Sequence, residues 1–318
     1  MDARVTVSWS IGGAPGDTTF LLPQAIAATT HHFVVYDAVA RNLTALDPVT
    51  GRVAWRFGRA GRGPNEFGGV ATVGPRLEGG VNVIDHGNQR LTPVREDGRP
   101  GAATDFAVGV NPRGLCELRG AQLRLRGIVD KELERIPAGS TEGVTTALPW
   151  PELSMEPPIV RQSKLFTVAA GEACVLTLSF GPRFAILDEA GTRVAGEWVE
   201  RIPLARAVSP ARGSWRMQPG SAYSTASVSS VGDAFAVLFE GTSTLKLRLL
   251  DFYSLRNGDY LFSLQLPFAA KYMTYGHGVM LLAGETDEGE PFVRAVRFAP
   301  TLEELVKRAS TDHPRTRS

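Results

Sequence analysis

The sequence predicts an all-β fold built from many short strands. Of its 318 residues, 34 are glycine and 21 are proline, and these turn formers are scattered along the whole chain. Between them lie short apolar runs such as HFVVYD, VNVID, ACVLTLSF, AFAVLFE and VMLLAG. These runs are apolar on both faces of the pleat, as expected for strands that are covered on both sides. Long stretches of helical periodicity are nearly missing.

A repeat indicates how these strands are organised. When Val34–Gly51 is placed over Asn82–Gly98 at an offset of 48 residues, an apolar pair with Asp, a Leu-Thr pair and a glycine turn coincide. Repeats of 40–50 residues that each contain several short strands are typical of β-propeller blades. The same turn pattern recurs with aspartates 50, 91 and 63 residues apart, at Asp47, Asp97, Asp188 and Asp251.

The repeat predicts a six-bladed β-propeller. The expected blades cover residues 21–58, 67–107, 108–150, 155–202, 221–267 and 269–298. The sixth is one strand short, and we expect Arg4–Ile11 to supply that strand, because closing the ring removes open sheet edges. Seven blades, one of them degenerate, are the alternative. Pro137–Pro158 is rich in proline and glycine and is expected to form a surface loop.

The end of the chain has a different pattern. Residues 1–300 are expected to form a single propeller domain, and residues 301–318 a short helix with a disordered tail. Thr301 and Glu304 have the spacing of a capping box, which marks a helix start. The apolar stripe of this helix consists of Leu302, Leu305 and Val306.

The segment Phe57–Gly69 reads FGRAGRGPNEFGG. It is not a nucleotide-binding loop: Glu66 stands where a dinucleotide fingerprint starting at Gly61 needs its third glycine, the lysine of a P-loop is missing, and a strand follows instead of a helix. We interpret it as a structural turn between two blades, with Glu66 pairing with an arginine or accepting backbone N–H groups. The turn residues are Gly58, Gly61, Gly63, Pro64, Asn65 and Glu66.

This segment carries a family resemblance. GRAGRGPNEF at Gly58–Phe67, followed by VNVIDHGNQRLTPV, resembles the GRGPGEF-type motif of bacterial six-bladed propellers related to NHL and TolB-type proteins. Asn65 stands where that family most often has glycine, and asparagine is the other residue that best tolerates a positive φ. The resemblance implies an extracytoplasmic, periplasmic protein that binds or scaffolds others; a cytoplasmic location is the alternative.

Repeated carboxylates raise the question of a metal site. Asp37 and Asp85 occupy equivalent repeat positions, where they either line the channel or bond the amides of the next turn, and repetition favours the second reading. A metal-dependent enzyme would have to use these two with Asn88 and His277. The histidines show no metal-binding spacing, and they are His31, His32, His86, His277 and His313. We therefore expect no catalytic residues, no metal and no cofactor.

Loop residues with large side chains are the candidates for partner contact. These are Arg59, Arg62, Trp150, Trp215 and Arg216, the kinds of residue that often anchor a protein partner. The net charge of +1 argues against nucleic-acid binding, and no apolar run is long enough to cross a membrane.

Two cysteines are present, Cys116 and Cys174. Neither belongs to a CxxC pair, and we expect two buried thiols in preference to a disulfide.

These observations favour a non-enzymatic propeller that acts as a protein-binding scaffold or an accessory subunit of a larger assembly. The alternatives are a metal-dependent enzyme of the lactonase or lyase type and a propeller that binds a small ligand such as a sugar. The fold does not decide between them, since propellers host many activities.

Overall fold

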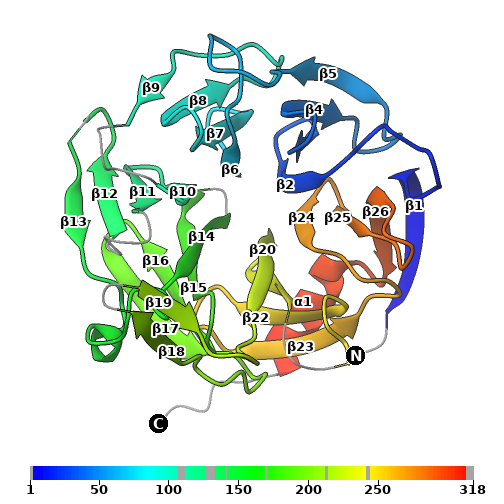
Figure 1. Cartoon of the computed structure of the whole chain (residues 1–318). Coiled ribbons are helices and arrows are strands. Elements are labelled where there is room, and N and C mark those ends of the chain that lie inside the picture. The colour runs from blue at the N-terminus through cyan, green and yellow to red at the C-terminus, as the bar shows by residue number, and fades with distance from the viewer. Residues whose placement is uncertain are drawn as a thin grey trace.

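The computed structural model describes residues 3–106, 112–126, 133–140, 142–168, 171–211, 214–240 and 244–312. Six four-stranded antiparallel sheets are arranged around a central axis, so the predicted six-bladed propeller is confirmed (Figure 1). In five of these sheets the innermost strand comes first along the chain and the following strands pair outward, whereas in the sixth the outermost strand comes from the N-terminus.

The blades begin close to where the repeat places them. Blade one contains β2 (Pro23–Ala28), β3 (Phe33–Asp37), β4 (Asn42–Leu46) and β5 (Val53–Phe57). Blade two contains β6 (Val70–Pro75), β7 (Val81–Asp85), β8 (Arg90–Val94) and β9 (Thr104–Asp105). Blade three contains β10 (Gly114–Glu117), β11 (Ala121–Leu125), β12 (Leu133–Pro137) and β13 (Val144–Thr146).

The second half of the ring has the same plan. Blade four contains β14 (Ser163–Val168), β15 (Ala173–Leu178), β16 (Arg183–Asp188) and β17 (Gly191–Glu197). Blade five contains β20 (Thr225–Val231), β21 (Ala234–Phe239), β22 (Leu249–Ser254) and β23 (Tyr260–Gln265). Blade six contains β24 (Tyr272–Gly276), β25 (Val279–Glu285), β26 (Pro291–Ala299) and β1 (Arg4–Gly12). Outside the blades lie η1 (Pro151–Leu153), β18 (Ala207–Ala211), β19 (Ser214–Met217) and α1 (Leu302–Asp312).

The N-terminal strand closes the ring, as predicted. β1 pairs antiparallel with β26, with Arg4 opposite Ala299 and Gly12 opposite Phe292. The two ends of the chain thus share one sheet, and blade six has no unpaired outer edge on β26.

The core lies between the blades. The second strands β3, β7, β15 and β21 are buried along their whole length, which explains their apolar character on both faces. Between blades four and five, Phe184, Trp198, Phe235 and Tyr253 form one aromatic cluster, in which Phe184 and Trp198 stack with ring centroids 4.4 Å apart. Stacked aromatic pairs of this kind add to the energy of burial.

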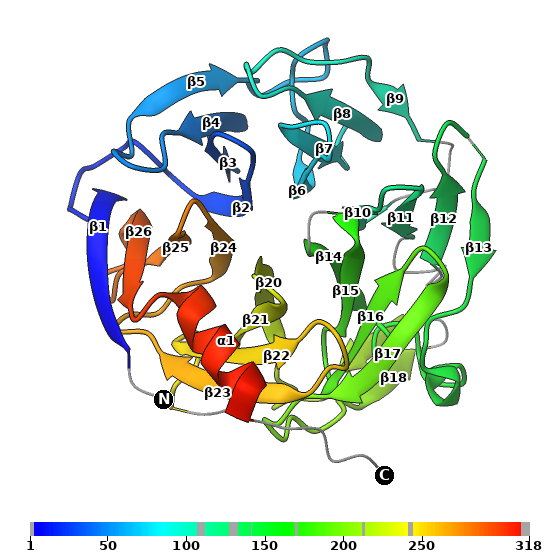
Figure 2. The ribbon, with the colours of Figure 1, turned by 180° about the vertical axis from the view of Figure 1, so that it is seen from behind.

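The C-terminal helix begins with the predicted capping box. The backbone N–H of Thr301 donates to the Glu304 carboxylate at 2.9 Å, and the Glu304 N–H donates to Thr301 Oγ1 at 3.3 Å. The predicted stripe is buried together with Ala309 against blades five and six, and Figure 2 shows α1 lying across that side of the disc. The tail beyond residue 312 lies outside the described residues.

Strand order defines two faces of the disc. The connection face carries the links from one blade to the next, at residues 13–22, 58–69, 147–162, 198–224 and 266–271, together with the turns between second and third strands. All six inner strands start at this face. The opposite turn face carries the hairpins between first and second and between third and fourth strands, and α1 packs there.

Two sequence expectations about blades three and four are corrected. Cys116 on β10 and Cys174 on β15 form a disulfide between blades three and four, so the prediction of two separate thiols is wrong. Their Cα atoms are 6.0 Å apart, which suits a disulfide. The segment 137–158 is not only loop, because β13 lies within it.

Asp251 does not belong to the turn aspartates. Asp47 and Asp188 accept N–H bonds from the residues that follow them in a turn, at 2.7–3.2 Å. Asp251 instead lies inside β22, and Ser254 occupies the equivalent turn position, where its carbonyl accepts the Gly258 N–H at 2.9 Å. The repeat pattern therefore predicted the start of this turn at Asp251, three residues before its actual start at Ser254.

Candidate functional site

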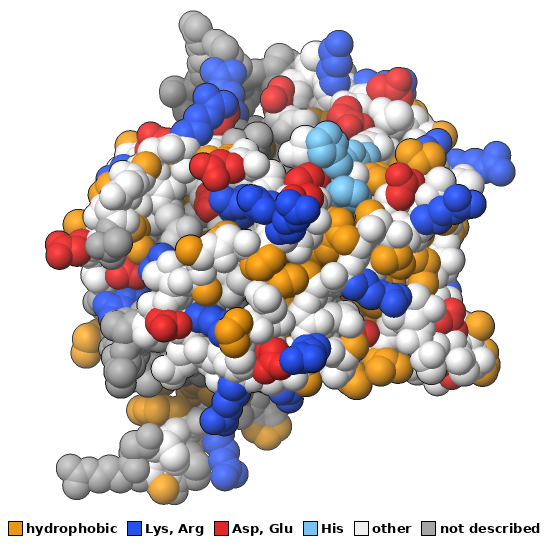
Figure 3. All heavy atoms as spheres, turned by 90° about the horizontal axis from the view of Figure 1, so that it is seen from above, with side chains coloured by type: hydrophobic (Ala, Val, Ile, Leu, Met, Phe, Trp, Pro, Cys, Tyr) orange, Lys and Arg blue, Asp and Glu red, His pale blue; other side chains and the backbone are white. Residues whose placement is uncertain are grey.

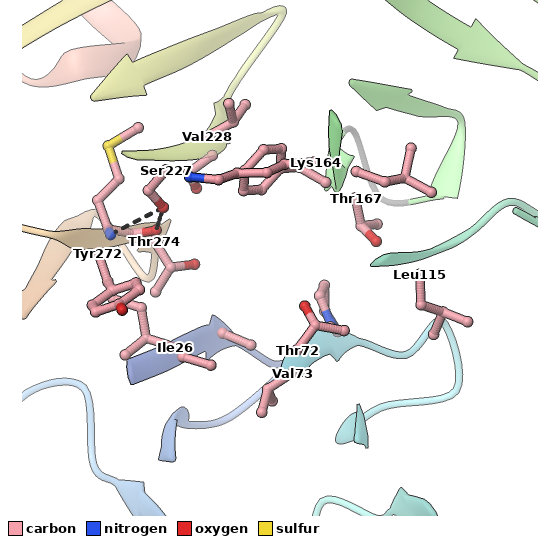
Figure 4. Close-up of a pocket in the computed structure, with 18 of the residues that line it drawn as sticks. Ile26, Thr72, Val73, Leu115, Lys164, Thr167, Ser227, Val228, Tyr272 and Thr274 are labelled. Atoms are coloured by element: carbon pink, nitrogen blue, oxygen red, sulfur yellow. Dashed lines mark hydrogen bonds between the residues drawn. The ribbon is translucent and has the colours of Figure 1, made fainter. Parts of the chain in front are cut away.

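The structure offers two candidate sites, the central channel and a surface above blade four. The channel contains a cavity of ≈ 560 Å³. It is lined by the inner strands β2, β6, β10, β14, β20 and β24, so every blade contributes (Figure 4).

Side chains of the inner strands join neighbouring blades across the channel wall. Ser227 Oγ donates to the carbonyl of Met273 at 3.0 Å and accepts its N–H at 3.2 Å, which links blades five and six (Figure 4). Thr274 Oγ1 accepts the N–H of Ala28 at 3.1 Å and links blades six and one. These hydroxyls satisfy edge groups of strands that have no strand partner on the channel side.

A lysine makes the corresponding link between blades four and five. Lys164 Nζ donates to the carbonyl of Thr225 at 2.6 Å, and its side chain extends along the channel wall toward Ser227 in Figure 4. Burial lowers the pKa of the Lys164 ammonium, while the charge of Glu240 opposes this change. Among the described residues, Lys164 Nζ is hydrogen-bonded to neutral carbonyl oxygens and not to a carboxylate.

Two further basic residues reach the channel at the connection face, Arg113 before β10 and His86 after β7. Burial lowers the pKa of the His86 ring, and the nearby charge of Arg113 lowers it further. Sequence reasoning did not single out Lys164 or Arg113, because neither lies in a motif and only the ring geometry brings them to one cavity.

The residues nominated for a metal-dependent enzyme do not converge in the channel. None of Asp37, Asp85, Asn88 and His277 is among the described residues that line the cavity. Across the described residues, no three His, Cys, Asp or Glu side chains lie together as a group able to hold a metal ion. His313 lies outside the described part of the chain.

The repeated aspartates bond backbone amides. Asp37 Oδ2 accepts the N–H of Leu21 at 2.6 Å, and its Oδ1 accepts those of Val39 and Ala40 at 2.9 Å. Asp85 accepts the N–H groups of two glycines, Gly68 and Gly69, at 3.0 Å. Each carboxylate therefore fastens the connection that enters its own blade.

The remaining nominated pair also has structural contacts. Asn88 Nδ2 donates to Asp85 at 2.8 Å and to the carbonyl of Gly61 at 3.0 Å. His277 occupies a turn with φ of +55°, and its ring packs edge-on against Phe33.

The glycine-rich segment is bonded within itself. Asn65 has a φ of +60°, the left-handed conformation that its position in the motif requires. Glu66 accepts the Gly63 N–H at 2.7 Å and forms an ion pair with Arg59 at 2.9 Å. Arg62 is exposed, and its guanidinium has no hydrogen bond or ion pair among the residues that the structure describes.

The segment is also bonded to blade two. Arg90 donates to the carbonyls of Gly63 and Glu66, and Gly68 crosses Gly87 so closely that a Cβ on Gly87 would lie 2.3 Å from the Gly68 carbonyl carbon. Glycine is needed at this crossing because no side chain fits between the two backbones.

The tryptophans expected at a partner surface lie in different surroundings. Trp150 is only 4% exposed and packs in the core between blades three and four, so it is removed from the expected surface. Trp215 is 44% exposed on the hairpin β18–β19, and Arg216 beside it is also exposed.

Exposed apolar side chains gather above blade four. Five of the twelve large exposed apolar residues among those described lie in the connections 147–162 and 198–224, which border this blade on the connection face. We call these two connections the blade-four surface. Its exposed apolar residues are Met155, Val199, Val208, Trp215 and Tyr223.

The blade-four surface is anchored to one turn. The N–H of Ser179 donates to the carbonyl of Gln162 at 2.7 Å, and the N–H of Ala205 donates to that of Phe180 at 3.0 Å. Arg183 forms ion pairs with Glu152 in one connection and with Glu197, the last residue of β17 before the other connection. Both connections are thus held against the turn between β15 and β16.

The rim of the disc has a different character. On the side seen in Figure 3, basic and acidic side chains are interspersed, with apolar side chains between them. No helix in the described part of the chain is long and apolar enough to cross a bilayer.

Comparison with known proteins supports the fold. No family model and no curated protein matches the chain, so the NHL and TolB resemblance stays a prediction. Among solved structures, virginiamycin B lyase from Staphylococcus aureus is similar at 8% identity and a TM-score of 0.54, covering 93% of this chain and 99% of that one.

Two further solved structures are similar. The Cps50 (Swd1) propeller domain of Myceliophteria thermophila has 12% identity and a TM-score of 0.52, over 92% of this chain and 99% of that one. U3-55K has 12% identity and a TM-score of 0.53, over 92% and 98%. At these identities the likeness concerns the fold and not the activity.

Proposed function

We propose that this propeller is a non-enzymatic binding protein that holds a protein partner on its blade-four surface, as a scaffold or an accessory subunit. The observation that carries the proposal is the gathering of exposed apolar side chains in the two connections that border blade four. Single exposed apolar residues are normal on a protein, but these five fall in two segments that are bonded to the same turn of blade four, and we take this concentration as support for an interaction site.

The composition of the surface supports a protein partner. Trp215 and Arg216 are consecutive exposed residues of β19, and tryptophan and arginine are enriched among residues that dominate binding energy. The connections are bonded to the segment 179–183, so they would lose little conformational freedom when a partner binds.

We further propose that the protein works outside the cytoplasm. The support is the disulfide between Cys116 and Cys174, since such bonds persist mainly in oxidising compartments.

Site-specific photocrosslinking tests the partner proposal. p-Benzoylphenylalanine at Trp215 or Met155, in the protein produced in its own host, is expected to give one discrete crosslinked product. The matched control is Val49, which is 69% exposed but lies on the turn face. The same product at Val49, or none at either blade-four position, would contradict the proposal.

A double variant provides the second arm. Trp215→Ala with Arg216→Ala is expected to abolish the crosslink formed from Met155. Both side chains are exposed, so the melting temperature should change by only about 2 °C or less. A crosslink of unchanged yield would show that the hairpin does not contact the partner.

A further inference from the structure

The central channel contains positive charge without matching negative charge. Its cavity of ≈ 560 Å³ lies within the size range of small-molecule sites. The described residues that line it include Lys164, Arg113 and His86 but no aspartate or glutamate. This site is separate from the blade-four surface and goes beyond the function proposed above.

Arg113 and Lys164 lie at the same end of the channel. Arg113 precedes β10 and Lys164 is the second residue of β14, and both strands start at the connection face. The strands pack together at this point, because a Cβ on Gly114 would lie 2.9 Å from that of Leu165. The cations therefore come from adjacent positions on neighbouring blades.

Among the described residues, neither Arg113 nor Lys164 forms an ion pair with a carboxylate. The Arg113 guanidinium forms no ion pair or hydrogen bond with the residues that the structure describes. Lys164 Nζ contacts the carbonyl oxygens of Thr225 and Ala226 at 2.6 and 3.5 Å. Glu240, whose charge acts on Lys164, forms its ion pair with Lys246 at 3.1 Å. Arg113 is exposed and Lys164 is half-buried, so an anionic ligand would supply the counter-charge that the channel wall lacks.

The channel wall also offers hydrogen-bond donors. Ser229 Oγ accepts the N–H of Tyr275 at 2.7 Å, and Thr274 Oγ1 accepts that of Ala28 at 3.1 Å. Because each oxygen already accepts a bond, its own O–H remains available to donate. Both residues line the cavity, so the wall suits a ligand rich in acceptor oxygens.

We propose that the channel binds a small organic anion through its carboxylate or phosphate group, with Arg113 and Lys164 as the binding residues. The guanidinium of Arg113 provides the planar pair of donors that matches either group. Lys164 adds a second charge from the neighbouring blade, and the channel hydroxyls face the rest of the ligand.

Calorimetric titration of the intact protein in about 150 mM salt tests this proposal. The probes are inorganic phosphate, citrate, glucose 6-phosphate and galacturonate, with glucose and galactose as neutral counterparts of the last two. We expect at least one anion to bind with a Kd below about 1 mM, and its neutral counterpart, where the pair exists, at least about tenfold more weakly. The phosphate and carboxylate probes distinguish the two head groups.

The variant Arg113→Gln is expected to raise the Kd about tenfold or more, since it removes charge-assisted hydrogen bonds. Arg62→Gln is the matched control, an exposed arginine on the same face but outside the channel, and should leave the Kd unchanged. The proposal is overturned by any of three results: no anion binds up to about 10 mM, neutral sugars bind equally well, or Arg113→Gln binds like the parent.

Discussion

Asp251→Asn is expected to stabilise this propeller at neutral pH. Asp251 is 2% exposed inside β22, and among the described residues its carboxylate accepts a single hydrogen bond, from Ser263 Oγ at 2.5 Å. Burial raises the pKa of Asp251 from 3.8 to about 6; the Ser263 bond opposes this rise and the charge of Glu200 adds to it. Ionisation of this carboxyl group therefore lowers the stability of the folded state.

The sign of the pH dependence follows from the raised pKa. The folded state holds this proton more tightly than the unfolded chain, so the contribution of Asp251 to stability is fully present below about pH 4 and is lost as the pH rises through about 6. A pKa raised from 3.8 to about 6 corresponds to about 3 kcal/mol at pH 7.5. Asparagine keeps the shape and the Oδ1 acceptor but carries no charge. Allowing about 1 kcal/mol for its buried amide N–H groups, we expect a net gain of about 2 kcal/mol.

Urea unfolding at pH 7.5 and pH 4.5 measures this difference. The Asp251→Asn variant should be more stable than the parent at pH 7.5, and its advantage should shrink strongly at pH 4.5, where the parent carboxyl group is protonated. Asp97→Asn, at a half-exposed turn position, is the control and should show no such advantage. The reasoning is refuted if Asp251→Asn is the less stable protein at pH 7.5 by an amount that does not change with pH.

Two further predictions concern links between blades. Replacing Cys116 and Cys174 together by alanine should lower the free energy of unfolding by about 4 kcal/mol, because the disulfide closes a loop of 58 residues; an unchanged urea midpoint would argue against this stabilisation. Burial raises the pKa of Glu96, but hydrogen bonds from Thr29 Oγ1 and from the N–H groups of His31 and Gly80 outweigh it, so the pKa is lowered overall. The stability from Glu96 is therefore present above its ordinary pKa and is lost as the pH falls through the lowered value. Glu96→Gln should cost about 1–2 kcal/mol at pH 7, and this cost should shrink steadily as the pH falls below the ordinary pKa of Glu96, as denaturant titrations at a series of pH values would reveal.

Much of the fold could be predicted because its signals are local. A buried second strand appears as an apolar run, a turn appears as glycine or aspartate at a set position, and both recur once per blade. Closure by Arg4–Ile11 followed from counting the strands of the last blade, and the helix start followed from Thr301 and Glu304. Asp251 was wrongly assigned to a turn, because the sequence pattern of an aspartate after an apolar run is the same whether the aspartate lies inside a strand or at its end.

Local patterns predicted six blades, with seven as the alternative, and also the closing strand, the helix cap and the nature of the glycine-rich turn, since each depends on neighbours a few residues apart or on a regular period. Only the tertiary structure decided which distant residues meet. It joined Cys116 to Cys174, buried Trp150 and brought Lys164 and Arg113 to one channel. Such encounters depend on how the ring brings blades side by side, and no local pattern encodes that distance.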